Sequence, residues 1–452
     1  MKILSQLVSL LAVTQAQTSD HWAVLVAGSK GFVNYRHQAD VCHAYHTLRD
    51  QGIEEDHIIV MAFDDVAQDD ENPFPGTLYN TQGGPNVYDG CIIDFVGDDV
   101  TKQNFQAILR GDAASLNITN EATTGRVLES DDKSKVFLYF SDHGSPGHLM
   151  FPDSVIYADE LNETIQSMHE SKMYEELVIF LEACESGSIF KNIDLEKVNA
   201  WALTATNSTS PSYGTYCYPH DEIEGENLFT CLGDMFSVSW MTYLENNKEA
   251  LSSMSLKQFY DVIKERVSKS QVQHFGSPNI ESMLINGVLL PEKEESSSHF
   301  LKAYGGFLVS QGISDQINGP DFDKDRWSMV HSVASRDIYM HHLYTKLQKN
   351  PTRKLRIELM KELEQSLMLE EIFSLFLDVP SSKIDSCKHY DEEGLECVDE
   401  FVPNDFDCLR RFNEQFEKSC GKHTDQSRKY VKYFVRECEH ESDIDQALER
   451  LK

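Results

Sequence analysis

Short runs of apolar residues recur along the first half of the chain, and each run is nearly continuous rather than alternating. Five of them stand out: "HWAVLVAG" (21–28), "HIIVMAF" (57–63), "VFLYFS" (136–141), "LVIFLEA" (177–183) and "AWALTAT" (200–206). Continuous apolar runs of this length are typical of strands that are buried on both faces of a sheet. We therefore expect these runs to form the core strands of one sheet.

Amphipathic stretches lie between some of these runs and predict helices. The segment "HQADVCHAYHTLRDQG" (37–52) finishes at Gly52, and glycine commonly follows the end of a helix. Strands that alternate with helices from His21 to about Leu290 predict a mostly parallel sheet with helices on both faces. In such α/β folds the functional crevice lies outside the carboxyl ends of the strands.

The pattern changes after residue 290. "PEKEESSS" (291–298) and "GISDQINGPDFDKD" (312–325) are polar and rich in turn-forming residues, as linkers are. Further on, leucines recur every four residues from Leu355 to Leu367, and "EEIFSLFLDV" (370–379) continues the helical pattern until Pro380. We expect a linker or activation segment over residues 291–335 and an all-α region over residues 336–452.

The first 16 residues, "MKILSQLVSLLAVTQA", predict a secretory signal peptide that is cleaved near Ala16, which leaves an α/β domain over residues 17–290. An early lysine, an apolar stretch and a small residue before the cleavage point support this interpretation. Three sequons fit transit through the secretory pathway, where their asparagines would be glycosylated: Asn117, Asn162 and Asn207.

The net charge excludes two classes of partner. Asp and Glu number 74 against 40 Lys and Arg, so the formal charge is -34 at pH 7. A surface this acidic repels nucleic acid and anionic membranes, and no later stretch has the length of a transmembrane helix. Acid would relieve the self-repulsion, which favours an acidic working compartment.

Two reactive side chains stand directly after two of the predicted strands. His143 lies in "FSDHGSPG" and Cys184 in "EACESGS", and both should emerge at the same edge of the sheet. A cysteine thiolate attacks carbonyl carbon, and a histidine can take the thiol proton and pass it to the leaving amine. The glycines that follow allow backbone N–H groups to approach the oxyanion closely.

Longer motifs strengthen this interpretation. The segments "GSKGFVNYRHQADVCHAY", "MAFDDVAQDDENPFPG", "FSDHGSPG", "EACESGS" and "CLGDMFSVSWM" resemble the peptidase domain of legumains, the asparaginyl endopeptidases. The resemblance implies a caspase-like fold, cleavage of protein and peptide substrates after exposed Asn, with Asp accepted at lower pH, and residence in the lysosome or vacuole or secretion. It also implies synthesis as a zymogen that its own C-terminal prodomain inhibits, with no cofactor and no metal.

The resemblance assigns site residues by matching motifs. It implies that Cys184 is the nucleophile, His143 the general acid and base, Asn34 the group that orients the histidine, and Gly144 an oxyanion-hole position. Five residues match the specificity pocket: Arg36, His37, Glu182, Ser212 and Asp234. Asp142 matches an aspartate that is prone to form a succinimide and is linked to peptide ligation.

The chemistry of the pocket residues agrees with that assignment. A carboxamide presents one acceptor oxygen and two donor hydrogens. Arg36 can donate to the oxygen, and Glu182 and Asp234 can accept from the nitrogen. An Asp substrate would oppose these acceptors unless it were protonated, so acid should widen the specificity.

The ten cysteines divide evenly between the first part of the chain and its last fifth. Cys217 and Cys231 flank one loop and are expected to bridge it. By resemblance to the family's prodomain, Cys408 is expected to pair with Cys438, while Cys387, Cys397 and Cys420 remain unassigned. The helical spacing of Cys42, His43 and His46 indicates a packed helix rather than a metal site.

Activation should require self-cleavage after an Asn or Asp in or near the linker: Asn318 lies within it, and Asn350 lies where the family's processing region should fall. Pro351 follows Asn350 and makes that bond a poor substrate. We expect low pH to protonate carboxylates at the domain interface and so to loosen the prodomain. Two other functions compete with hydrolysis: peptide ligation or transamidation through the same acyl-enzyme, and a binding protein without activity, against which the retained Cys184 and His143 argue.

Overall fold

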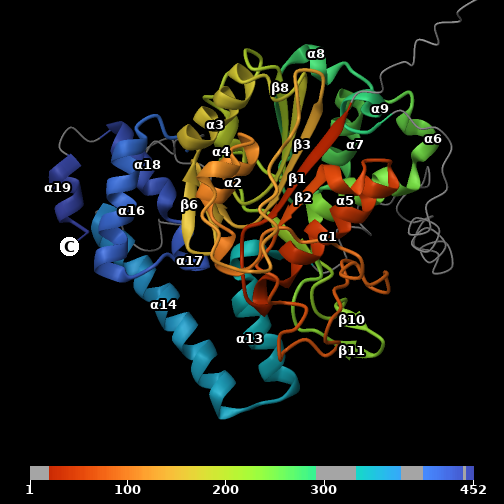
Figure 1. Cartoon of the computed structure of the whole chain (residues 1–452). Coiled ribbons are helices and arrows are strands. Elements are labelled where there is room, and N and C mark those ends of the chain that lie inside the picture. The colour runs from red at the N-terminus through yellow and green to blue at the C-terminus, as the bar shows by residue number, and fades with distance from the viewer. Residues whose placement is uncertain (1–19, 292–331, 378–400, 441–443, 452) are drawn as a thin grey trace, which may run out of the picture.

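The computed structural model describes residues 20–291, 332–377, 401–440 and 444–451 (Figure 1). We refer to residues 20–291 as the α/β part and to the described residues from 332 onward as the helical part. The predicted signal peptide, Asn318, Cys387 and Cys397 lie outside the described residues. Within the described part of the chain, no helix is long and apolar enough to span a membrane.

A six-stranded sheet forms the centre of the α/β part, with the strand order β13-β8-β7-β3-β1-β2. Five of these strands run parallel, and β13 pairs antiparallel with β8 at the edge. The strands are β1 (His21–Ala27), β2 (Ile58–Met61), β3 (Lys135–Ser141), β7 (Glu176–Glu182), β8 (Ala200–Thr204) and β13 (Gln273–Gly276). The five apolar runs of the sequence supply the five parallel strands. Every residue of these five strands is buried, as continuous apolar patterning predicts.

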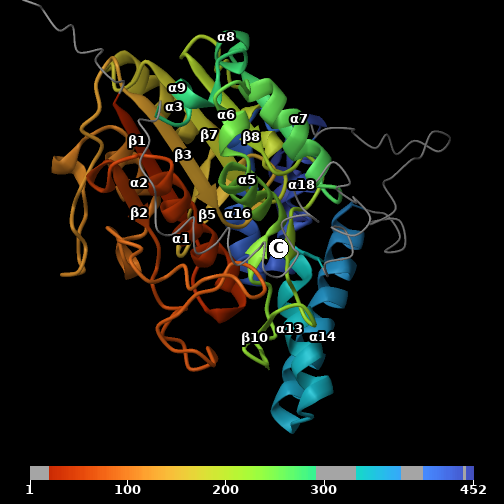
Figure 2. The ribbon, with the colours of Figure 1, turned by 90° about the vertical axis from the view of Figure 1, so that its right-hand side faces the viewer.

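Helices cover both faces of this sheet (Figures 1 and 2). One face packs on α1 (Tyr35–Asp50), α5 (Met235–Asn246) and α7 (Leu256–Arg266). The other packs on α2 (Lys102–Leu109), α3 (Ala158–Glu170) and α4 (Gly187–Phe190). Helix α1 ends just before Gly52, whose φ of 106° suits a residue without a side chain.

Two small sheets and several short elements complete the α/β part. One small sheet contains β4 (Gly144–Ser145), β5 (His148–Phe151) and β6 (Ser154–Tyr157). The other contains β12 (Gly233–Asp234) and β9 (Tyr213–Thr215), and β14 (Val333–Ala334) from the helical part adds to β9 at its edge. The remaining elements are η1 (Phe32–Asn34), η2 (Glu55–His57), η3 (Gly97–Asp99), η4 (Ala113–Ser115), the hairpin β10 (Glu222–Ile223) and β11 (Glu226–Asn227), α6 (Lys248–Leu251), α8 (Pro278–Glu281) and α9 (Ile285–Val288).

The helical part packs against the α/β part. It contains η5 (Ser335–Asp337), α13 (Ile338–Lys349), α14 (Arg353–Leu377), α16 (Phe406–Cys420), α17 (Asp425–Arg428), α18 (Val431–His440) and α19 (Ile444–Glu449). In Figure 1, α16 and α18 lie beside β6, while α13 and α14 project below the sheet. Tyr157 at the end of β6 belongs to the same apolar cluster as the buried phenylalanines of α14, α16 and α18. The prediction of a mostly parallel sheet with flanking helices, followed by a disulfide-linked helical region, is confirmed.

Three disulfides are present among the described residues. Cys217 pairs with Cys231 and Cys408 with Cys438, which are the two pairs named from the sequence. The third, between Cys42 and Cys91, ties α1 to a loop 49 residues further along the chain, and the sequence did not indicate it. Cys184 is a buried free thiol and Cys420 an exposed one.

Candidate active site

The sheet register brings the histidine and cysteine motifs together. Strands β3 and β7 are parallel neighbours, and Ser141 pairs with Glu182 where both strands end. His143 and Cys184 each stand two residues beyond that pair, at the same edge of the sheet. Glu185, directly after Cys184, has a φ of 48°, a conformation that is rare for a residue with a side chain and that marks a sharp turn at this point.

Gly144 lies against the backbone of the cysteine. A Cβ atom at position 144 would stand 2.5 Å from the carbonyl oxygen of Cys184 and 3.0 Å from the Cβ of Ala183. Real Cβ atoms do not approach a backbone oxygen this closely, so this position requires glycine. The two backbones meet here as closely as an oxyanion-hole residue beside a nucleophile demands.

We expect Gly144→Ala to lower kcat/KM by about 10²-fold or more, because the added methyl group must push the 183–185 backbone away from residue 144 and so move the N–H donor. Steady-state kinetics on the processed enzyme would measure the loss. The unfolding midpoint of the same preparation is the control, because it separates a displaced donor from general misfolding. A folded variant with wild-type kcat/KM would contradict this role.

The sulfur of Cys184 has Ser212 as its neighbour. The Ser212 N–H donates to Sγ over 3.3 Å, and the Ser212 hydroxyl lies 3.6 Å from Sγ. Burial raises the pKa of the thiol, and the nearby charge of Arg336 only partly offsets this rise. The cysteine is therefore a neutral thiol rather than an activated thiolate while the helical part covers it.

The imidazole of His143 is oriented by Asn34. The Asn34 side-chain NH₂ donates to the carbonyl of Lys30 over 2.9 Å, so its oxygen faces Nε2 of His143, also at 2.9 Å. Nε2 must therefore carry the hydrogen, which leaves Nδ1 as the basic nitrogen. Burial lowers the pKa of His143 to about 3, although the charge of Asp425 works in the opposite direction.

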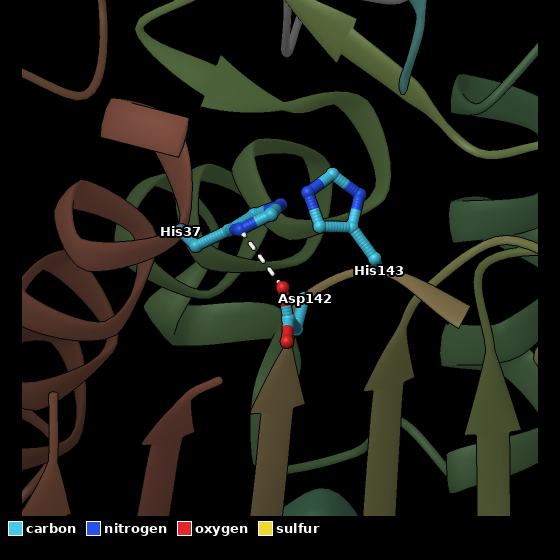
Figure 3. A group of neighbouring side chains, drawn as sticks. All are labelled: His37, Asp142 and His143. Carbon is cyan, nitrogen blue, oxygen red and sulfur yellow. Dashed lines mark ion pairs between the residues drawn. The ribbon is translucent and has the colours of Figure 1, made fainter. Parts of the chain in front are cut away.

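A carboxylate and a second imidazole lie beside His143 (Figure 3). Nδ1 of His37 lies 3.3 Å from Oδ1 of Asp142, and the two imidazole rings meet edge to face with their centroids 5.1 Å apart. Burial raises the pKa of Asp142 well above its usual range. Three ligand atoms from this group lie within 4.8 Å of one another, a spacing that a metal ion could also use. However, Nδ1 of His37 already contacts the Ser29 hydroxyl at 2.6 Å, and Nε2 of His143 is bound to Asn34.

The remaining pocket residues cluster behind this group. Nε of Arg36 donates to Oδ1 of Asp234 over 3.0 Å, and Nε2 of His37 lies 3.6 Å from Oδ2 of Asp234. Oε2 of Glu182 accepts from both the N–H and the hydroxyl of Ser237, each over 2.9 Å. Burial raises the pKa of both Glu182 and Asp234. The structure thus brings Arg36, His37, Glu182 and Asp234 together and places Ser212 beside the sulfur.

Some buried polar atoms of this cluster have no hydrogen-bond partner among the described residues. They are Nη2 of Arg36, Oε1 of Glu182, Oδ2 of Asp234, and both carboxylate oxygens of Asp142. Buried polar groups in folded proteins are nearly always paired, so a set of unpaired ones in a single cluster indicates a place for a polar ligand.

The helical part covers the site through contacts that the sequence did not reveal. Arg336 forms an ion pair with Glu185, the residue after Cys184. Asp425 of α17 lies 3.6 Å from Nε2 of His143 and is itself paired with Arg428. Arg336 and Glu185, like Asp425 and His143, are more than 150 residues apart along the chain, and no local pattern could have found these contacts.

Backbone pairing continues this cover. Strand β14 adds to β9, and the N–H of Ser335 donates to the carbonyl of Ser212 over 2.9 Å. The Ser335 hydroxyl lies 3.0 Å from that of Ser212, which is the neighbour of the sulfur. Gln426 of α17 holds η5 in place, because its side-chain NH₂ donates to the carbonyl of Arg336 over 2.8 Å. Residues 333–335, at the end of the predicted linker, and Arg336 directly after them are therefore seated beside Ser212 and Glu185.

Comparison with known proteins identifies this arrangement. Residues 21–292 match the peptidase C13 family. The hemoglobinase of Schistosoma mansoni is 34% identical over 414 residues, which cover 90% of this chain and 85% of that protein. The vacuolar-processing enzyme beta-isozyme of Arabidopsis thaliana is 36% identical over 428 residues, covering 92% and 82% of the two chains.

The legumain of Mus musculus is 42% identical over 265 residues, which cover 59% of this chain and 58% of that protein. Among solved structures, caspase-1 of Spodoptera frugiperda is similar with a TM-score of 0.34 and 10% identity, covering 57% of this chain and 87% of that one. From the match over residues 21–292 and the relatives that span nine-tenths of its length, the chain belongs to the peptidase C13 family and is a cysteine endopeptidase of the legumain type.

Proposed function

We propose that this protein is the zymogen of an endopeptidase that cleaves after Asn, and after Asp at lower pH. One observation carries the proposal: the unpaired buried atoms match a carboxamide. Nη2 of Arg36 is a donor for the amide oxygen, while Oε1 of Glu182 and Oδ2 of Asp234 are acceptors for the amide NH₂. A side chain without these groups would leave buried polar atoms unpaired and so bind more weakly.

The proposed reaction gives each of the residues matched from the sequence one role. His143 takes the proton from the thiol of Cys184, and the thiolate attacks the backbone carbonyl carbon of the substrate Asn. The N–H of Gly144 stabilises the oxyanion of the tetrahedral intermediate. When that intermediate collapses, the C–N bond breaks, His143 protonates the departing amine and a thioester remains on Cys184. Water, deprotonated by His143, then releases the acid and restores the thiol.

The helical part acts as the inhibitory prodomain in this proposal. Its Arg336 forms an ion pair with Glu185 beside Cys184, and its Asp425 lies against the imidazole of His143. The thiol of Cys184 is kept buried and neutral. Substrate can approach only after residues 333–336 and α17 have moved away. The domain limits 17–290 and 336–452, with residues 291–335 as the activation segment, stay a prediction from the sequence within this proposal.

Two details of processing belong to the same proposal. Asn350 is the exposed residue that follows α13, and Pro351 makes its bond a poor substrate, whereas Asn318 lies outside the described residues. The sequons at Asn117, Asn162 and Asn207 lie on exposed or partly exposed positions, which fits glycosylation on the way to a vacuole or lysosome. Asp142, which is buried beside His37, is the residue that we propose for succinimide formation.

Three peptides that differ only in Asn, Asp or Gln at the cleaved position would test the specificity. With acid-activated protein, we expect kcat/KM for Asn to exceed that for Gln by at least about 10²-fold, because the extra methylene of Gln misplaces its amide against fixed partners. Asp should approach Asn only as the pH falls and the carboxylates lose charge. Equal cleavage of Asn and Gln would contradict the proposal. Weighing the products in the presence of an added amine distinguishes hydrolysis from transfer.

A further inference from the structure

A buried polar chain runs behind the specificity pocket, and neither the dyad nor the substrate contacts account for it. It starts at Glu245 on α5, passes through His43 and Asn80, and ends at Asp40, which is fully buried on α1. Arg36, Asp40 and His43 stand at positions i, i+4 and i+7, so one face of α1 carries both the pocket and this chain.

The hydrogen bonds fix the direction of the chain. The NH₂ of Asn80 donates to Oδ1 of Asp40 over 2.7 Å and to the carbonyl of Leu232 over 3.1 Å, so its oxygen must face His43. Nδ1 of His43 donates to that oxygen over 2.7 Å, and Nε2 donates to Glu245 over 2.8 Å. With both nitrogens donating, His43 is an imidazolium. Its pKa is raised because Glu245 and Asn80 together outweigh the effect of burial.

At the far end of this series of hydrogen bonds, Asp40 holds β12, the strand that carries Asp234. The N–H of Asp234 lies 3.3 Å from each carboxylate oxygen of Asp40. Asn80 packs so tightly on β12 that a Cβ at Gly233 would stand 2.7 Å from its Nδ2. Any movement of Asp40 or Asn80 would therefore move Asp234 relative to Arg36.

The charges around Asp40 and Asp234 are unbalanced. Burial, followed by the charge of Asp234, raises the pKa of Asp40 well above its usual range, and the bond from Asn80 opposes this rise. The charge of Asp234 thus discourages ionisation of both Asp40 and Glu182, while the Arg36 guanidinium favours the ionised forms of Glu182 and Asp234. The charged and titratable groups that face them are Arg36, His37 and His43 on α1, Tyr139 on β3, Glu182 on β7 and Asp234 on β12.

We propose that Asp40 is a positioning residue that sets the preference of the pocket between carboxamide and carboxylate side chains of the substrate. This inference rests on the proposed function. Asp40 holds Asp234 in place through the N–H of Asp234, and above its raised pKa it adds a negative charge behind that residue, which the His43–Glu245 pair supports. An ionised Asp side chain of a substrate is then repelled until acid removes part of this charge.

Asp40→Asn tests the idea, because an asparagine keeps the shape and the bonds. Its oxygen still accepts from Asn80 and Asp234, and its NH₂ takes the place of the oxygen that lies 3.3 Å from the Ser141 hydroxyl. We expect the ratio of kcat/KM for an Asp peptide to that for an Asn peptide to rise on the order of tenfold at pH values above the raised pKa of Asp40, where the wild type carries the charge that the variant lacks. The pH at which this ratio reaches half its maximum should move up by about one unit. A purely structural role would lower both rates together and leave this pH profile in place, which would overturn the proposal.

Two further variants complete the experiment. Asp99→Asn is the matched control, since Asp99 is a buried carboxylate that accepts backbone N–H bonds from Thr119 and Asn120 away from the pocket, and its ratio should equal that of the wild type. Glu245→Gln removes the anion that keeps His43 charged, and should shift the profile in the same direction by a smaller amount. If Asp40→Asn does not fold, an unshifted profile for Glu245→Gln overturns the proposal.

The outcomes separate this inference from the proposed function. A wild-type enzyme that fails to cleave the Asn peptide would refute the proposed function itself. A wild-type enzyme that cleaves it, beside an Asp40→Asn variant with an unchanged ratio at every pH, would refute only the role of Asp40.

Discussion

Replacement of Cys184 by serine is expected to lower kcat/KM by at least about 10³-fold, because the serine hydroxyl is far less acidic and His143 would have to activate it without the help of a thiolate. The variant should be processed by added wild-type enzyme before assay, so that the loss of self-cleavage is not counted as a loss of turnover. Hydrolysis of the Asn peptide is then measured directly.

Cys420→Ser is the matched control for this variant, since Cys420 is the exposed free thiol of α16 and has no place at the site. Its activity should equal that of the wild type. His143→Ala should lose as much activity as Cys184→Ser, and the double variant should lose little more, because residues that act as a unit are not additive. A Cys184→Ser enzyme that retains most of its turnover would show that another group is the nucleophile.

Acid should release the helical part through buried histidines. His148 of β5 and His423, which stacks on Phe416, lie where α16 and α17 meet the α/β part, and burial lowers the pKa of each to about 3. An exposed imidazole titrates near pH 6.5, so the open form binds more protons than the closed form between about pH 6.5 and pH 3. The closed form is therefore favoured above pH 6.5 and loses about 1.4 kcal/mol per pH unit and imidazole as the pH falls through this window.

The carboxylates at this interface respond to acid in two directions. The charges of His143 and three arginines lower the pKa of Asp425, overcoming the effect of burial, so Asp425 favours the closed form until the pH falls below its usual range. Burial raises the pKa of Glu185 to about 7, so the closed form takes up this proton first and acid does not disfavour it. That interface carboxylates loosen the helical part in acid stays a prediction: the lowered pKa of Asp425 agrees with it at low pH, and the raised pKa of Glu185 does not.

The double variant His148→Asn with His423→Asn should convert to the processed form at least about tenfold more slowly at pH 4.5 than the wild type, since neither side chain can take up a proton on opening. The conversion can be followed by gel electrophoresis over time. His169→Asn is the control, because His169 is an exposed histidine on α3. A double variant that is processed at the wild-type rate would contradict the trigger.

Local sequence patterns anticipated much of the framework. The apolar runs predicted β1, β2, β3, β7 and β8, and the position of His143 and Cys184 after two of them predicted their meeting at one edge. The sequence patterns did not predict strand β13, because "QHFG" is short, only partly buried and antiparallel at the edge of the sheet. The leucine period predicted α14 but not its buried side: Leu363 and Leu367 are exposed, while Leu369, Phe373 and Phe376 face the core of the helical part.

The sequence by itself determined which segments become strands and helices and where two reactive side chains stand on them, because periodicity and strand ends are local properties of the chain. Only the tertiary structure decided which distant groups meet: the Cys42–Cys91 bond, Arg336 against Glu185, Asp425 against His143, and Asp40 behind Asp234. It also decided the burial that moves the pKa of these groups, since desolvation depends on everything packed around a side chain and not on its neighbours in sequence.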